Sequence, residues 1–78
     1  MRCTARLDKY EIWLGSRYNL FAMAVADEYN SIRYHRYLKK WFRDWLEEYN
    51  IKWDWDSTYG VLYVYKEEDA VLIMTTWN

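Results

Sequence analysis

The second half of the chain contains the clearest alternation of apolar and polar positions. In residues 51–56, isoleucine and two tryptophans alternate with lysine and two aspartates, a period-two pattern typical of a strand with one buried face. Residues 57–60 supply a turn, and the apolar run 61–65 predicts a partner strand, so that the two strands form a hairpin. Residues 10–14 also predict a strand, because a run of aromatic and β-branched residues ends there at Gly15.

A helical periodicity covers residues 31–49. Ser31 precedes the periodic run and is placed to act as its N-cap. The apolar residues that recur at three- and four-residue spacing are Tyr34, Leu38, Trp41, Phe42, Trp45, Leu46 and Tyr49. This spacing predicts one long amphipathic helix, with one face packed on the sheet and the other facing water or a partner. The same projection places His35, the single histidine, on the apolar face.

Two segments are ambiguous between helix and strand. Residues 20–26 are apolar on every face, and their alanine and methionine content favours a short helix. Residues 70–77 have apolar positions at helical spacing after three acids, although their β-branched residues favour a strand; we predict a short C-terminal helix. The predicted fold of residues 1–78 is a single α+β domain: a small antiparallel sheet of about three strands packed against one long amphipathic helix.

Composition limits the class of protein. A hydrophobic fraction of 53% without proline predicts a folded chain, and 78 residues leave little room for an enclosed active site beside a core. Cys3 is the single cysteine, so no internal disulfide can form, and a reducing, intracellular setting is expected. No apolar run has the length of a membrane span and no signal peptide pattern is present, so no membrane partner is predicted.

Few residues suggest catalysis. Residues 54–58, Asp-Trp-Asp-Ser-Thr, match the opening motif of haloacid-dehalogenase-type phosphatases, but that chemistry also needs a doubly wound parallel sheet and distant lysine and carboxylate residues. Solvent-facing strand residues beside a turn are the better interpretation. His35 has no second histidine for a zinc site, and Cys3 has no assignable base. We therefore predict no enzyme, no catalytic residues, no metal ligands and no cofactor.

Charge is unevenly shared along the chain. Residues 1–43 hold 9 basic and 4 acidic residues, whereas residues 44–78 hold 2 basic and 8 acidic ones. In the predicted long helix the bases come first and the acids last, which opposes the helix macrodipole and suggests a function for the basic face. The candidate partner-binding residues are Arg33, Arg36, Lys39, Lys40 and Arg43. The alternative is a solvated face in which Lys40 pairs with Asp44 and Arg43 with Glu47.

Basic residues combined with aromatic ones also suggest single-stranded nucleic acid as a partner. Four aromatic residues on the predicted hairpin could stack bases, as in an RNA-recognition sheet: Trp53, Trp55, Tyr63 and Tyr65. A net charge of −1, however, offers little counterion release on binding a polyanion. Nucleic-acid binding is therefore the second hypothesis.

The last 18 or so residues carry a resemblance. A strand ending at Tyr65, an acidic turn over residues 66–70 and Trp77 near the end make this segment similar to the C-terminus of many small tailed-bacteriophage proteins. The resemblance implies a viral accessory protein that binds and modulates or inhibits a host protein in the host cytoplasm, for example a defence or transcription component. It brings no catalytic residues with it.

Self-association is a further expectation. The chain has 6 Trp, 9 Tyr and 2 Phe, more aromatic residues than a core of this size easily hides. A homodimer and a monomer are both compatible with this composition.

Overall fold

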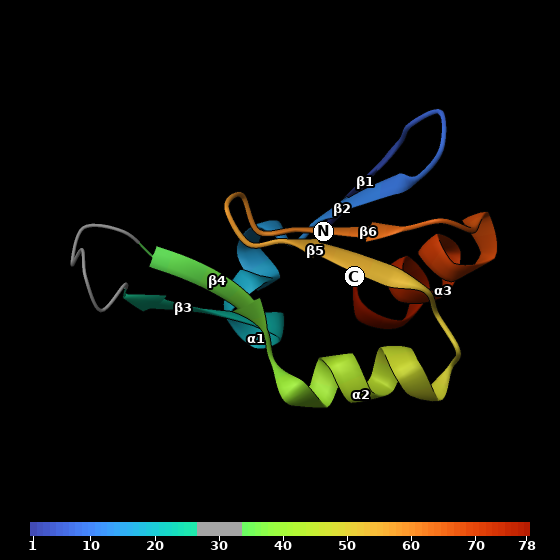
Figure 1. The fold of residues 1–78 in the computed structure, drawn as a ribbon. Helices are drawn as coiled ribbons and strands as arrows, with labels where there is room; N and C mark the ends of the chain where they lie inside the picture. Colours follow the sequence, from blue (N-terminus) through green and yellow to red (C-terminus); the bar gives the residue numbers. More distant parts are fainter. Residues whose placement is uncertain (27–33) are drawn as a thin grey trace.

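The computed structural model describes residues 1–26 and 34–78 (Figure 1). Along the chain its elements are β1 (Arg2–Ala5), β2 (Tyr10–Trp13), the 3-10 helix η1 (Gly15–Arg17), α1 (Tyr18–Phe21), β3 (Ala22–Ala26), β4 (Tyr34–Leu38), α2 (Lys40–Glu48), β5 (Trp53–Asp56), β6 (Val61–Val64) and α3 (Glu67–Trp77). The predicted α+β class is confirmed. The described strands form a four-stranded sheet and a separate two-stranded sheet.

The four-stranded sheet has the order β1-β2-β6-β5, with every neighbouring pair antiparallel. It consists of two hairpins, β1–β2 and β5–β6, which lie side by side through β2 and β6. The strands predicted at residues 10–14, 51–56 and 61–65 are confirmed over residues 10–13, 53–56 and 61–64. Strand β1 was not predicted, because Arg-Cys-Thr-Ala has no clear alternation; it is added as a partner of β2.

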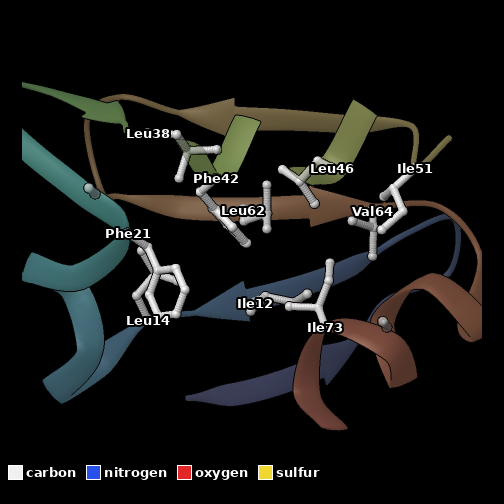
Figure 2. Packing of buried hydrophobic residues seen from close by; sticks show 12 residues of the cluster. Ile12, Leu14, Phe21, Leu38, Phe42, Leu46, Ile51, Leu62, Val64 and Ile73 are labelled. Atoms are coloured by element: carbon white, nitrogen blue, oxygen red, sulfur yellow. The ribbon is translucent and has the colours of Figure 1, made fainter. Parts of the chain in front are cut away.

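One face of this sheet carries the core. The register places Ile12 beside Leu62 in the two central strands, with Val64 two residues further along the same face. All three side chains are buried, and they belong to one cluster with Ile73 of α3 and Phe42 and Leu46 of α2 (Figure 2). Both helices therefore pack on the same face of the sheet.

The predicted C-terminal helix is confirmed as α3. Three acids occupy its first turn, where the positive end of the helix dipole stabilises negative charge. Ala70 and Ile73 are buried, three residues apart, and Met74 and Trp77 are packed against the same core. Burial of this face outweighs the strand preference of the β-branched residues in the segment.

The long helix predicted over residues 31–49 is wrong in its first half. Helix α2 begins only at Lys40, and residues 34–38 form β4. Residues four positions apart, such as Tyr34 and Leu38, lie on the same face of a helix and also on the same face of a strand. The burial of Leu38 therefore fits either structure, and the spacing did not distinguish helix from strand. Residues 34–38 form a strand because they pair with β3 in an antiparallel ladder. Ser31, the expected N-cap, lies outside the described residues.

The short helix predicted over residues 20–26 is also wrong for most of its length. Helix α1 ends at Phe21, and residues 22–26 form β3, which pairs antiparallel with β4. Alanine and methionine favour helices only weakly, and a five-residue ladder outweighs that preference.

Strands β3 and β4 form a ribbon that projects from the body of the protein (Figure 1). Its base is fixed by the buried pair Ala22 and Leu38 and by the Lys39 N–H, which donates to the Phe21 carbonyl at 2.8 Å. Beyond the base, Met23, Val25 and every residue between and after them on β3 are exposed. The ribbon thus has an apolar strand that the body of the domain does not cover.

Candidate functional site

A groove of about 680 Å³ lies where the ribbon, the start of α2 and β5 meet. The residues that line this binding groove are Met23, Tyr37, Leu38, Lys39, Lys40, Arg43, Trp53, Asp54 and Trp55. Hydrogen bonds at Arg36 hold strand β4 against the hairpin β5–β6. The Arg36 N–H donates to the Ser57 carbonyl at 3.2 Å, and the Trp55 Nε1–H donates to the Arg36 carbonyl at 2.8 Å. The second of these bonds joins a residue that lines the groove, Trp55, to the ribbon.

Three basic side chains line the groove at the start of α2: Lys39, Lys40 and Arg43. Lys39 Nζ donates to the Asn19 carbonyl at 2.6 Å, and Lys40 Nζ lies 2.7 Å from Asp44 Oδ2, so the predicted Lys40–Asp44 pair is confirmed. Arg43 is exposed, and among the described residues its guanidinium has no hydrogen bond or ion pair. Helix α2 has no acid in its first turn and no side-chain cap, so its dipole adds positive potential here.

Aromatic side chains provide most of the apolar surface of the groove. Tyr37 is 49% exposed on the ribbon, beside Met23 in the ladder, which is also 49% exposed. Trp53 and Trp55 are half-buried on β5, and the bond from Trp55 Nε1 to β4 fixes the orientation of that ring. Preordered aromatic side chains beside a free guanidinium form the kind of surface that anchors protein interfaces.

The five predicted partner-binding residues are only partly brought together. Lys39, Lys40 and Arg43 line the groove, whereas Arg36 does not. Arg36 lies on β4 instead of a helix, and its Nη1 donates to the Thr58 carbonyl at 2.6 Å. Arg33 lies outside the described residues. The basic stripe expected on one helix face is thus divided between a strand and a helix.

Arg36 has a structural role at the hairpin turn. Gly60 ends the turn with φ +70°, and a Cβ there would lie 3.1 Å from both Arg36 Cδ and Tyr18 Cε2. Glycine therefore permits both the left-handed backbone and the close approach of the arginine stem. With its bond to Thr58, the Arg36 side chain attaches the ribbon to the turn of the β5–β6 hairpin.

Met23 and Tyr37 are the site residues that the sequence analysis missed. Met23 was assigned to a separate short helix, and Tyr37 was counted in neither the apolar nor the basic set of the predicted long helix. The ladder pairing of Met23 with Tyr37 brings them together in the groove. A strand assignment for residues 22–26 and 34–38 would have been the signal that identifies them.

The two aspartates of the phosphatase-like motif, Asp54 and Asp56, accept hydrogen bonds within the β5–β6 hairpin and its flanking residues. Asp56 Oδ1 accepts the N–H groups of Thr58 at 2.8 Å and Tyr59 at 3.0 Å, the pattern of an Asx turn. Asp54 accepts a hydrogen bond from the Tyr65 hydroxyl. This bond, together with burial and the Asp54 charge, raises the pKa of Tyr65 above its ordinary value. Both carboxylates thus have local structural partners.

The four aromatic residues proposed as a base-stacking surface do not share one face. Asp54 pairs with Tyr63 in the ladder, whereas Trp53 pairs with Val64 and Trp55 with Leu62. The tryptophans therefore lie on the core side of the sheet and Tyr63 on the other. The arrangement expected from an RNA-recognition sheet is wrong for this hairpin, although both tryptophans line the binding groove.

The remaining candidate residues are placed as follows. His35 is exposed on β4, so its expected position on an apolar helix face is wrong. Cys3 is half-buried in β1, and burial raises the pKa of its thiol, which stays protonated near neutral pH. Within residues 1–26 and 34–78 no group of three or more His, Cys, Asp or Glu is placed to hold a metal ion. No helix of the described chain is long and apolar enough to cross a membrane.

Comparison with protein-family models, with curated proteins and with solved structures found no match to this chain.

Proposed function

We propose that this chain is a small accessory protein, of the viral kind that its C-terminal segment resembles, which binds a host protein and modulates or inhibits it. The host protein docks in the binding groove and on the adjoining exposed side of the ribbon. The proposal rests on one observation: Met23 and Tyr37 are exposed next to the unpaired guanidinium of Arg43. Methionine, tyrosine and arginine are enriched in protein interfaces, and tyrosine and arginine often dominate the binding energy.

The charged residues of the groove indicate which side chains a partner would bring to it. Three cations and the N-terminus of α2 lie against one carboxylate, Asp54, which already accepts a bond from Tyr65. Arg43 is free to bind a carboxylate in bidentate geometry, whereas Lys40 already has Asp44 as its partner. The expected partner surface therefore combines an acidic side chain, for Arg43, with an apolar one that packs against Tyr37 and Met23.

Protein is favoured over nucleic acid by the same surface. Two of the three groove cations are already engaged, by the Asn19 carbonyl and by Asp44, and Asp54 would repel a phosphate. The exposed Met23 and Val25 offer apolar contacts that a phosphate backbone does not use. The net charge of −1 also limits the electrostatic attraction of a polyanion.

A pull-down from a bacterial lysate, with and without nuclease, tests this proposal when four variants accompany the tagged chain. Tyr37→Ala and Arg43→Ala change the groove. Tyr59→Ala and Lys66→Ala remove an exposed tyrosine and an exposed cation that do not line it. Truncating an interface anchor costs about 2 kcal/mol or more, roughly a thirtyfold weaker Kd. We expect a nuclease-resistant partner that the first pair loses and the second pair retains.

Two outcomes would contradict the proposal. Equal capture by all four variants would exclude the groove as the docking site. Recovery that disappears with nuclease, together with single-stranded RNA binding that weakens steeply with salt, would replace the protein partner with nucleic acid.

A further inference from the structure

The outer edge of β3 is an unprotected strand edge. Within the described residues β3 pairs only with β4, so one side of its backbone has no ladder partner. Its sequence, Ala-Met-Ala-Val-Ala, has no charge, no proline and no glycine. Edge strands that stay single usually carry lysine, proline or a bulge, because an uncharged, fully extended edge pairs readily with another strand.

The other edge strands among the described residues carry charge or have a neighbouring segment. Strand β1, at one edge of the four-stranded sheet, is four residues long and begins with the exposed Arg2. Strand β5, at the opposite edge, is approached by β4 through the Arg36 N–H and the Ser57 carbonyl. Among the described strands, β3 alone combines an open edge with an uncharged sequence.

We infer that β3 pairs antiparallel with β3 of a second copy of this chain, forming a homodimer around a continuous four-stranded sheet in the order β4-β3-β3-β4. A two-fold axis at Ala24 sets Ala22 opposite Ala26 of the second copy, and Met23 opposite Val25 of the second copy. No like charges face each other, and each methionine packs beside a valine. A strand that matches itself so well makes a second copy the fitting occupant of its edge.

Dimerisation also explains why the ribbon tolerates its exposure. A two-stranded sheet outside a core is only marginally stable in water, and independent stability needs at least three strands with an apolar face or packing against a helix. In the dimer the exposed Met23 and Val25 of both copies lie on one face of the merged sheet, since opposite residues in a ladder point the same way. This inference does not rest on the proposed function, because it is argued from the open backbone edge of β3 and needs no host protein, although Met23 belongs to both surfaces.

Sedimentation equilibrium of the full chain tests the inference, with variants that place a charge at Ala24, on the proposed two-fold axis. Ala24 faces Arg36 across the ribbon, so Ala24→Glu gains a favourable cross-strand pair within one chain. In the dimer, however, the two introduced carboxylates face each other. We expect the wild-type chain to sediment as a dimer and Ala24→Glu to weaken dimerisation at least tenfold. Val71→Glu, on the exposed side of α3, is the matched control and is expected to remain dimeric.

A mixture of two charge variants makes the test specific to β3. Ala24→Lys faces Arg36 as a like charge within its own chain. Alone it is expected to be monomeric, as Ala24→Glu is. An equimolar mixture of the two is expected to recover the dimer, because the glutamate of one copy then faces the lysine of the other at the axis. Circular dichroism of each variant reports folding separately. A wild-type chain that remains monomeric would overturn the inference, and so would an Ala24→Glu dimer as tight as the wild type or a mixture that stays monomeric.

Discussion

Trp77 packs among aromatic side chains of α1 and α2 in the described structure. Its ring lies at centroid distances of 5.7 Å from Phe21, 5.4 Å from Trp41, 6.3 Å from Phe42 and 5.4 Å from Trp45, with steep interplanar angles. Edge-to-face contacts of this kind add to the energy of burial. The tryptophan that marked the C-terminal resemblance therefore joins α3 to α1 and α2.

We expect Trp77→Ala to lower the free energy of unfolding by about 3 kcal/mol, because removing a large packed ring leaves a cavity among four aromatic side chains. Trp77→Phe should cost much less, since the Nε1–H of Trp77 is buried without a hydrogen-bond partner in the described structure and phenylalanine lacks it. Urea unfolding followed by circular dichroism measures both. Val71→Ala, on the exposed side of the same helix, is the control and should change stability by less than about 0.5 kcal/mol.

Tyr65 and Tyr63 give the fold a dependence on alkaline pH. The hydrogen bond to Asp54 raises the pKa of Tyr65, and burial followed by the charges of Asp56 and Glu11 raises that of Tyr63, both from 10.0. The folded state thus favours the neutral phenol. This stabilisation is fully present below the unfolded-state pKa of about 10 and is lost as the pH rises through the folded-state pKa.

Ultraviolet absorbance of tyrosinate across an alkaline titration measures this effect. We expect Asp54→Asn to lower the pKa of Tyr65 toward 10.0, because the charged acceptor is removed. Asp44→Asn changes a carboxylate that pairs with Lys40 on α2, and it should leave the titration unchanged. Equal titration curves for wild type and Asp54→Asn would contradict the assigned cause.

At the level of single elements, helix α2 ends in a C-terminal capping motif formed by Asn50 and Ile51. The Asn50 N–H donates to the Glu47 carbonyl at 3.0 Å and the Ile51 N–H to the Leu46 carbonyl at 2.9 Å, the pattern of a Schellman motif. Asn50 has φ +55°, and the buried Ile51 completes the motif next to Leu46. This stop directs the chain out of the helix and into β5.

Asn50→Ala should therefore destabilise the protein by about 1 kcal/mol, because a Cβ without a compensating polar group is disfavoured in the left-handed region. Asn50→Gly should leave stability unchanged or raise it by a few tenths of a kcal/mol. Chemical unfolding of the two variants tests the order. A more stable alanine variant than glycine variant would show that the backbone at residue 50 is not left-handed.

The helix prediction failed over residues 34–38, where a helical and a strand periodicity place the same residues on one face. Tyr34 and Leu38 are four residues apart, as on a helix face, but they also share one face of β4 with Arg36 between them. The choice depended on β3, whose own sequence is apolar on every side. By contrast, the 51–65 hairpin and the C-terminal helix were correctly predicted, because a turn with Gly60 and an acidic first turn are local signals.

At the level of the whole molecule, the binding groove is built from segments that are distant in sequence. Met23, Tyr37, Arg43 and Trp55 come from two strands of the ribbon, one helix and one strand of the main sheet. Of the five basic residues that the uneven charge distribution singled out, Lys39, Lys40 and Arg43 line the groove at the start of α2; their binding of a partner stays a prediction. Nothing local in the sequence indicated that tryptophans of β5 and a methionine of β3 would face them.

The sequence by itself determined the α+β class, the hairpin of β5 and β6 and the terminal helix, because each depends on neighbours a few positions apart. The tertiary structure alone decided that β2 pairs with β6, that residues 22–26 and 34–38 form a ribbon, and that Arg36 joins this ribbon to the hairpin turn. These features require contacts between distant segments. Their energies outweigh local propensities of a few tenths of a kcal/mol per residue.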